Sequence, residues 1–163
     1  MNYKIVKLKE VSGKMASIYS IKMEGDDLTI FEHFLLDYST IFNEEVEEIT
    51  AKIYNIGHKY GARNQFFKLN EGKGGDLVMA LYDHPNKNLR VYGIKYASTL
   101  IILGSGGHKP KSIRSFQEDE TLTTTNRFMR KVSDDVLKRT RDKEIWFSDN
   151  DLELLGNLEF KED

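Results

Sequence analysis

The sequence predicts an α+β fold in which strands and helices occupy separate stretches of the chain. Residues 1–25 carry strand patterns, residues 29–61 follow the helical period, and residues 66–103 return to short strand-like runs. A further helical pattern covers residues 117–142. Because strands and helices are grouped and do not alternate, we expect N-terminal strands and a helical hairpin packed on a small, mainly antiparallel twisted sheet, with a C-terminal helix.

The chain is long enough for one domain with a substantial core, and we treat residues 1–163 as that domain. Apolar residues make up 39% and charged residues 31%, which is typical of a soluble globular protein. The absence of cysteine excludes a disulfide framework, a cysteine-based zinc site and a cysteine nucleophile. The N-terminus has no apolar signal core, and no window approaches the roughly 20 apolar residues of a membrane helix, so we expect a cytoplasmic protein without membrane partners.

A strand hairpin or two edge strands are expected at the N-terminus. Residues 3–9 form a short run with β-branched side chains, and Ser12–Lys14 is a turn sequence. Residues 17–24 alternate between apolar and polar side chains, which is typical of a strand with one buried face. Gly25 and the two aspartates after it close this second strand.

Two helical segments follow, as either a helical hairpin or one bent helix. Thr29 and Glu32 have the spacing of a capping box, in which each side chain accepts a hydrogen bond from the other residue's backbone N–H. Asn43 has the residue type of a second helix cap, and the two glutamates after it favour the positive end of a helix. Gly57 or Gly61 ends the second helix. The apolar residues with helical spacing lie at positions 31, 34, 35, 38, 41, 42, 46, 49, 53 and 56.

Four strand-like runs make up the expected meander: residues 66–69, 77–82, 89–96 and 100–103. The glycine-rich turn at residues 70–76 is not a phosphate-binding loop, because it lacks the Gly-Lys-Ser/Thr ending and leads into a strand. The run 100–103, Leu-Ile-Ile-Leu, is apolar on both faces, which places it centrally in the sheet. Residues 104–107 then let the chain leave the sheet, and Pro110 stops the strand.

The C-terminal helix is expected to have one apolar and one basic face. Its apolar side holds Leu122, Met129, Val132, Val136 and Leu137. Its opposite side holds Arg127, Arg130, Lys131, Lys138 and Arg139. Residues 144–147 are expected to form a small strand, and the tail 151–160 is too apolar to be plainly disordered.

Charge is distributed unevenly along the chain, although the formal net charge is only -2. Residues 23–51 contain nine acids and no Lys or Arg, whereas no Asp or Glu lies between His84 and Gln117. The basic residues of that second stretch are Lys87, Arg90, Lys95, Lys109, Lys111 and Arg114. A strand pair that gathers cations on a nearly neutral protein indicates an anion site, and RNA phosphate is the first candidate.

Strand alternation suggests which of these side chains share a face. Arg90 and Tyr92 should lie on one face, and Lys95 on the other unless a bulge re-aims it. Lys109 and Lys111 follow the central strand two residues apart and could both point over one sheet face. A sheet face with these groups could hold a phosphodiester and stack a base on an aromatic ring. The alternative is that Tyr92 is an ordinary cross-strand packing residue and that the lysines are rim charges.

Histidine supplies the candidate for proton transfer. His108 and His84 lie in this region, and imidazole exchanges protons near neutral pH. Both are expected in turns, and His108 is the stronger candidate of the two. The histidines at positions 33, 58, 84 and 108 have no ligand-like spacing, so the sequence predicts no metal site and no cofactor.

The order of these elements resembles the RelE/ParE superfamily of toxins from bacterial toxin–antitoxin pairs, in particular its HigB-like, phage-type branch. The resemblance is carried by the helical hairpin, by residues 89–95 (Leu-Arg-Val-Tyr-Gly-Ile-Lys), and by residues 99–111, where an apolar last strand precedes Gly-x-x-Lys-x-Lys. Residues 156–160, Gly-Asn-Leu-Glu-Phe, resemble the end of long variants of this group. The resemblance covers residues 29–122, and residues 123–163 are then a C-terminal helical extension and tail.

The resemblance implies a metal-independent, ribosome-associated mRNA endoribonuclease, the toxin of a pair whose antitoxin is a small helix-turn-helix protein. In such a fold the RNA 2′-hydroxyl attacks its neighbouring phosphate while cations stabilise the developing charge. By position, Arg90 matches the sheet arginine that contacts the scissile phosphate, and Lys109 and Lys111 match the basic pair after the last strand. The family often has a Tyr or His shortly afterwards for proton transfer. Residues 112–116 hold neither, so His108 is the expected substitute.

The remaining cations and Tyr92 complete the expected site as RNA-binding residues: Lys87, Tyr92, Lys95 and Arg114. Two other functions are compatible with the same sequence. One is a non-nuclease toxin of this fold that inhibits a protein target such as DNA gyrase. The other is a nucleic-acid- or protein-binding module without toxicity that uses the basic C-terminal helix.

Overall fold

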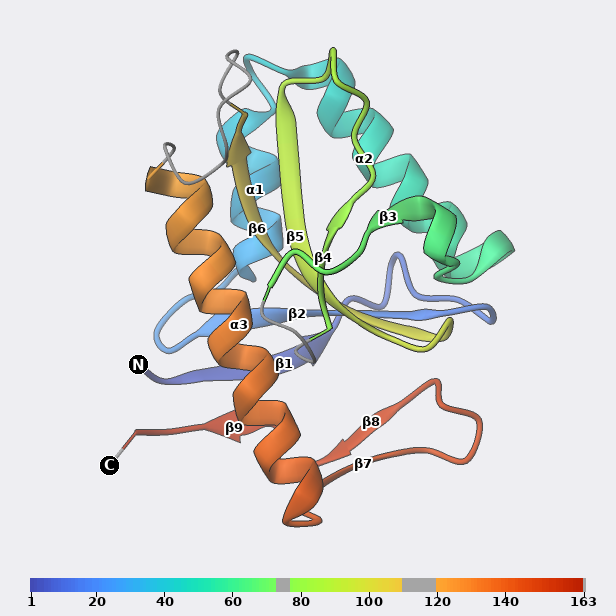
Figure 1. Ribbon diagram of the computed structural model, residues 1–163, viewed down its shortest axis with the longest axis vertical. Coiled ribbons are helices and arrows are strands. Elements are labelled where there is room, and N and C mark those ends of the chain that lie inside the picture. Colours follow the sequence, from blue (N-terminus) through green and yellow to red (C-terminus); the bar gives the residue numbers. More distant parts are fainter. Residues whose placement is uncertain (73–76, 110–119, 163) are drawn as a thin grey trace.

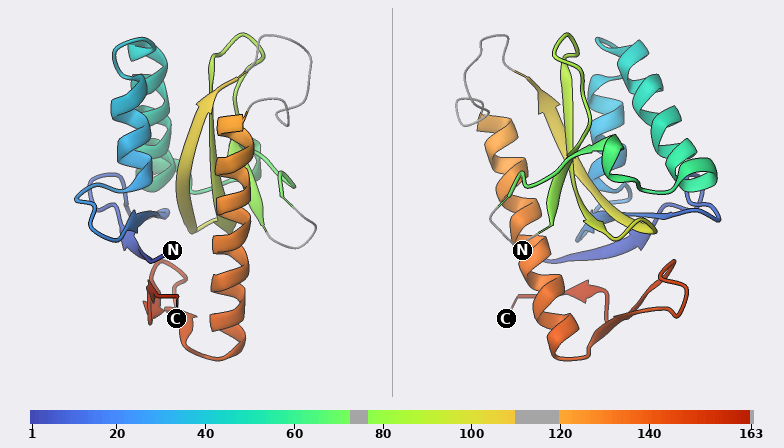
Figure 2. Two further views of the ribbon diagram at one scale, coloured as in Figure 1. Left: turned by 90° about the vertical axis from the view of Figure 1, so that its left-hand side faces the viewer. Right: turned by 45° about the vertical axis from the view of Figure 1, so that its right-hand side comes forward.

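The structure is a computed structural model that describes residues 1–72, 77–109 and 120–162. These residues form a twisted sheet with a helical hairpin on one face and a long helix on the other (Figures 1 and 2). Each face of the sheet has its own buried apolar cluster, one shared with the hairpin and one with the long helix.

The elements follow the chain in three groups. The first group is β1 (Tyr3–Lys7), β2 (Ser17–Met23), α1 (Ile30–Tyr38), α2 (Asn43–Asn55), a π-helical turn (Ile56–Tyr60) and a 3-10 turn (Asn64–Phe66). The meander is β3 (Phe67–Lys68), β4 (Val78–Leu81), β5 (Leu89–Tyr96) and β6 (Leu100–His108). The last group is α3 (Glu120–Arg141), β7 (Ile145–Phe147), β8 (Leu154–Gly156) and β9 (Glu159–Phe160).

The main sheet, within the described residues, has seven strands in the order β3-β4-β5-β6-β2-β1-β9. Its neighbouring strands are antiparallel except for β2 and β6, which run parallel. The α+β class and the mainly antiparallel sheet are therefore confirmed. The run Leu100–Leu103 lies in β6 between β5 and β2, so its central position is confirmed as well.

β1 and β2 form the predicted N-terminal hairpin, with Tyr3 opposite Met23 and Lys7 opposite Tyr19. The alternative of two edge strands is wrong, because β2 also pairs with β6 and β1 also pairs with β9. The parallel β2–β6 pairing joins the N-terminal strands to the meander in one sheet.

α1 begins with the predicted capping box. The Thr29 hydroxyl accepts a hydrogen bond from the Glu32 backbone N–H (3.2 Å), and the Glu32 carboxylate accepts one from the Thr29 backbone N–H (3.0 Å). α2 differs from the prediction, since Asn43 is its first helical residue and Phe42 holds the cap position without a side-chain hydrogen bond. The two helices form a hairpin (Figure 1). The π-helical turn after α2 ends at Gly61, whose φ of 75° favours glycine.

β6 is longer than predicted and contains a bulge. The strand continues through Gly104–Gly107 to His108, so the expectation that these glycines let the chain leave the sheet is wrong. Val91 pairs with Gly106 and Gly93 pairs with Leu103, so β6 spans three residues where β5 spans two. One extra residue in a strand is a β-bulge. Pro110, the predicted end of the strand, lies outside the described residues.

The bulge decides which side chains of β6 point to which face of the sheet. Gly104 and Gly107 both lie against α3, although side chains three apart on a regular strand point to opposite faces. The extra residue therefore turns His108 toward the helical hairpin, where its ring stacks on Phe42 with 5.2 Å between centroids. Lys109, one residue later, lies on the α3 side.

α3 packs its apolar face on the sheet as predicted. Leu122, Met129, Val132 and Val136 are buried in the cluster that the helix shares with the sheet, whereas Leu137 is 43% exposed and does not belong to it. Residues 117–119 of the predicted helix lie outside the described residues. After α3 the chain forms the small β7–β8 hairpin and returns as β9 to the edge of the main sheet (Figure 1). Of the described helices, none has the length and apolar character needed to cross a membrane.

Replacing Gly106 with alanine should destabilise the fold, because the added Cβ would lie 1.8 Å from the Arg90 carbonyl oxygen. Overpacking typically costs about 1–3 kcal/mol, and a backbone obstacle places this case at the upper end. Urea unfolding followed by circular dichroism measures the change. Gly107→Ala is the matched control, since its Cβ would meet only side-chain atoms, at 3.2 Å. Equal destabilisation by the two variants would contradict the bulge geometry.

Candidate functional site

The candidate site is a buried carboxylate, Asp83, surrounded by cations at one end of the sheet. Asp83 lies in the connection between β4 and β5 and is 8% exposed. Its Oδ1 atom lies 2.7 Å from the Lys68 Nζ. Its Oδ2 atom lies 2.9 Å from the Lys109 Nζ and 3.3 Å from the Arg90 Nε. Among the described residues, three cations from three strands or strand ends thus contact one carboxylate.

Strand pairing brings these residues together. β3 to β6 are consecutive neighbours in the sheet (Figure 1), and the side chains of Lys68 in β3, Arg90 in β5 and Lys109 after β6 meet at Asp83. The Lys109 backbone N–H donates to the Asn88 carbonyl (2.7 Å), which extends the β5–β6 ladder by one bond. The Lys109 ammonium also donates to the His84 carbonyl (3.0 Å), which fixes the end of its side chain.

The cations determine the charge state of the site. Burial raises the pKa of Asp83, but Lys68, Lys109 and Arg90 outweigh it and hold this pKa below its usual range. Burial lowers the pKa of Arg90, and the nearby Asp83 carboxylate more than offsets that effect and raises it. The three cationic side chains and the one carboxylate of this cluster together carry a formal charge of +2.

Tyr92 lies on the same face as Arg90, as predicted, but it belongs to the core. Its side chain is fully buried in the cluster shared with α3. Burial raises the pKa of the Tyr92 hydroxyl, and the Arg90 guanidinium lowers it in part. A ring without exposed surface does not offer a face to a nucleic-acid base, so the packing alternative describes Tyr92 better than the RNA-stacking one.

His108 does not join the cationic cluster. It lies opposite Leu89 in the β5–β6 register, and both side chains point toward the helical hairpin. Arg90 lies opposite Gly107 and points to the other face. The expected partnership of His108 with Arg90 and Lys109 is therefore not present in this structure.

The predicted RNA-binding lysines lie apart from each other. Lys87 is near the cluster, but its ammonium pairs with Glu48 (2.9 Å), which raises the pKa of Lys87. Lys95 lies at the far end of β5 from Arg90, and its ammonium donates to the Ala97 carbonyl. Its side chain points to the hairpin side of the sheet, so the bulge does not bring it to the face of Arg90. Lys111 and Arg114 lie outside the described residues.

Comparisons with protein-family models, with curated proteins and with solved structures found no match for this chain.

Sequence reasoning missed Asp83 and Lys68. Asp83 is the last acid before the stretch that lacks Asp and Glu, so its place at the border of that stretch was a possible indication. Lys68 stands alone beside a short strand, and no local pattern relates it to Arg90 or Lys109. The described residues contain no group of three or more His, Asp or Glu side chains that could hold a metal ion.

Replacing Asp83 with asparagine should destabilise the fold at neutral pH by about 3–5 kcal/mol, the usual cost of removing one partner of a buried ion pair. Because the pKa of Asp83 is lowered in the folded state, its ionisation stabilises the fold above the unfolded value of about pH 4. That stabilisation is lost as the pH falls through the lower, folded-state pKa. The difference in unfolding free energy between wild type and Asp83→Asn should therefore shrink on acidification.

Urea unfolding at a series of pH values measures this difference. Asp134→Asn is the control, because Asp134 is exposed on α3. This control should change the stability by less than about 0.5 kcal/mol at every pH. A stability difference for Asp83→Asn that stays constant into strong acid would show that the Asp83 charge does not stabilise the fold.

Proposed function

We propose that the chain is the toxin of a toxin–antitoxin pair and acts in the cytoplasm as a metal-independent, ribosome-associated mRNA endoribonuclease. The observation that carries this proposal is the convergence of Lys68, Arg90 and Lys109 on one carboxylate. Cations that hold the two oxygens of a carboxylate are also suited to the two non-bridging oxygens of a phosphodiester, since in both groups two oxygens share one negative charge and accept charge-assisted hydrogen bonds.

The order of elements supports the same proposal. A helical hairpin precedes an antiparallel meander, Arg90 lies in the penultimate strand β5, and Lys109 follows the apolar strand β6. These are the features on which the resemblance to the RelE/ParE superfamily depends. Arg90, which that resemblance assigns to the scissile phosphate, and Lys109, which it matches to the basic pair after the last strand, contact the same carboxylate oxygen.

The proposed reaction needs charge stabilisation more than any other contribution. The RNA 2′-oxygen forms a bond to phosphorus, the bond from phosphorus to the 5′-oxygen breaks, and the products are a 2′,3′-cyclic phosphate and a 5′-hydroxyl. The 2′-hydroxyl proton passes to water, and the 5′-oxygen takes a proton from water. The phosphorus oxygens gain negative charge on the way, and the formal charge of +2 around Asp83 favours that state over the singly charged substrate.

Asp83 acts here as a positioning residue. Its lowered pKa makes it a weak proton acceptor, so it is poorly suited as a general base. Its carboxylate instead holds Arg90 and Lys109 within 3.3 Å of one oxygen, where both could reach the same phosphate. His108 has no part in this chemistry, because its side chain points to the opposite face.

The proposed partners are mRNA on the ribosome and a small helix-turn-helix antitoxin. A toxin of the same fold that inhibits a protein such as DNA gyrase is the first alternative. A binding module without toxicity is the second, and one observation favours it: α3 exposes the basic residues Arg127, Lys138 and Arg141 along its outer side.

Expression of the chain in bacteria should arrest growth, and Arg90→Ala and Lys109→Ala should each relieve the arrest. Removal of one group that stabilises developing charge typically lowers a rate by about 10²–10³-fold. The direct measurement is cleavage of a defined message in a translating extract, with 5′ ends mapped by primer extension. Lys95→Ala is the matched control, because Lys95 lies on the same strand but on the other face.

Since Arg90 and Lys109 also stabilise Asp83, each variant should be checked for folding by circular dichroism before its activity is compared. Lys109→Arg keeps the charge and should retain part of the activity. If folded Arg90→Ala and Lys109→Ala proteins both remain fully toxic, the site is wrong. Growth arrest with intact message would favour the protein-inhibiting toxin, and no arrest at all would favour the binding module.

A further inference from the structure

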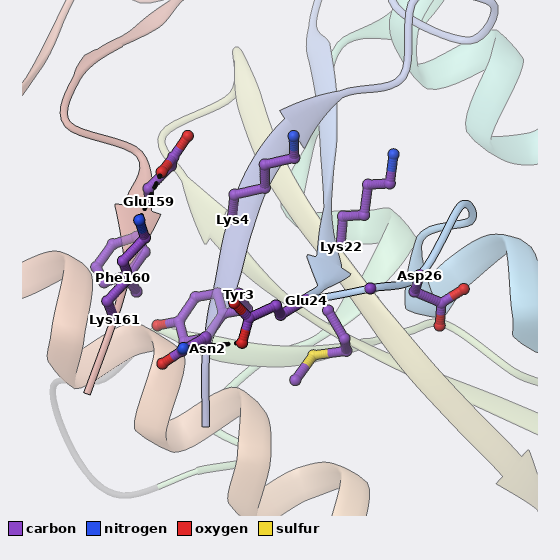
Figure 3. A pocket seen from close by; sticks show the side chains of 11 residues that line it. Asn2, Tyr3, Lys4, Lys22, Glu24, Asp26, Glu159, Phe160 and Lys161 are labelled. Carbon is purple, nitrogen blue, oxygen red and sulfur yellow. Dashed lines mark hydrogen bonds and ion pairs between the residues drawn. The ribbon is translucent and has the colours of Figure 1, made fainter. Parts of the chain in front are cut away.

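We propose a second anion site, in a groove along β1, β2 and β9, that binds a phosphate group carrying two negative charges. The groove has a volume of about 330 Å³, and Lys4 and Lys22 are among the residues that line it (Figure 3). The inference is independent of the proposed nuclease function, because it concerns other residues on other strands.

Lys4 and Lys22 form a like-charged pair across two strands. They lie directly opposite each other in the β1–β2 register. Their neighbours Ile5 and Ile21 are buried in the cluster on the α3 side, so both lysines leave the sheet on its other face. Figure 3 shows the two side chains extended side by side. Like charges in directly opposite positions destabilise a sheet, and an anion between them removes that repulsion.

The acids that line the groove have polar contacts of their own, and no hydrogen bond or ion pair joins any of them to Lys4 or Lys22 within the described residues. Glu24 accepts a hydrogen bond from Asn2 (2.9 Å), Asp26 pairs with His33 (2.8 Å), and Glu159 lies 3.9 Å from Lys161. Glu159 is opposite Lys4 in the β1–β9 register, yet no ion pair joins the two. Within the described ranges, the ammonium groups of Lys4 and Lys22 have neither a hydrogen bond nor an ion pair. The two ammonium groups therefore lie side by side without a carboxylate partner among the described residues.

The charge and shape of the groove select the class of ligand. Two ammonium groups on adjacent strands match a tetrahedral dianion, which can accept a hydrogen bond from each. A phosphate monoester carries about -1.5 to -2 charges near neutral pH, whereas a phosphodiester carries one. The same chemistry is presented by free inorganic phosphate and by the terminal phosphate of a nucleotide, and the groove has room for more than the phosphate alone.

Titration of the ¹⁵N-labelled protein at constant ionic strength tests the site. Inorganic phosphate and uridine 5′-monophosphate should each shift the backbone amide signals of β1 and β2, and uridine should not. Tighter binding of the nucleotide than of phosphate would identify a phosphorylated nucleoside as the ligand, and equal binding would identify the phosphate group alone. Absence of shifts with both phosphates would overturn the proposal.

A double variant tests whether Lys4 and Lys22 bind the phosphate. Lys4→Gln with Lys22→Gln should weaken phosphate binding by about tenfold or more, since both charge-assisted contacts are lost. Lys59→Gln, which removes an exposed charge elsewhere, should leave the affinity unchanged. Below about pH 6 the monoester phosphate of the nucleotide takes up a proton, so the nucleotide should bind more weakly, whereas the binding of sulfate should not weaken. Unchanged affinity in the double variant would place the bound phosphate elsewhere and refute the assignment.

Discussion

The buried charge of Asp83 is the constraint on which the meander depends. An ionised carboxylate that is 8% exposed is costly to hold away from water unless cations lie beside it. Its cations come from β3, from β5 and from the residue after β6, so each of these segments has to keep its place for the charge to stay paired. β3 has only two residues and one neighbour in the sheet, and its ion pair with Asp83 helps to hold that short edge strand against β4.

The bulge in β6 sets the chemical character of this end of the sheet. In a regular strand Gly104, Gly106 and His108 would share a face, and an imidazole would then stand beside Arg90. The extra residue reverses the direction in which the side chains after the bulge point. The Lys109 ammonium therefore joins the cluster, and the His108 imidazole faces the helical hairpin. A glycine sequence makes this possible, because a side chain at Gly106 would collide with the β5 backbone. A change of one residue in register thus places the Lys109 ammonium, and not the His108 imidazole, in the cluster around Asp83.

Features with local causes were predictable from the sequence, and features that depend on distant residues were not. The capping box at Thr29, the apolar face of α3 and the central run of β6 follow from residue types at fixed short spacings. The ion pair of Lys68 with Asp83 joins β3 to the connection between β4 and β5, and its formation depends on the register between β3 and β4. The bulge could not be predicted for a related reason. Glycines have no side chains that alternate between apolar and polar, so the sequence of this part of β6 does not indicate which residue points to which face of the sheet. The faces of His108 and Lys109 were therefore beyond what the sequence could predict.

Asp83 both organises the cations and competes with any anion that approaches them. Lys109 and Arg90 have side chains that are only 12% and 18% exposed, so an incoming phosphate can reach only a small part of their surface. Lys68 is 34% exposed and offers the more accessible contact. The chain holds the Asp83 carboxylate beside all three cations, and this disfavours its displacement by an anion from solution. An anion therefore binds through the net positive charge of the cluster while Asp83 stays in place. This arrangement disfavours tight binding of a singly charged anion and favours a state in which the bound group gains charge, which is the electrostatic condition that phosphodiester cleavage requires.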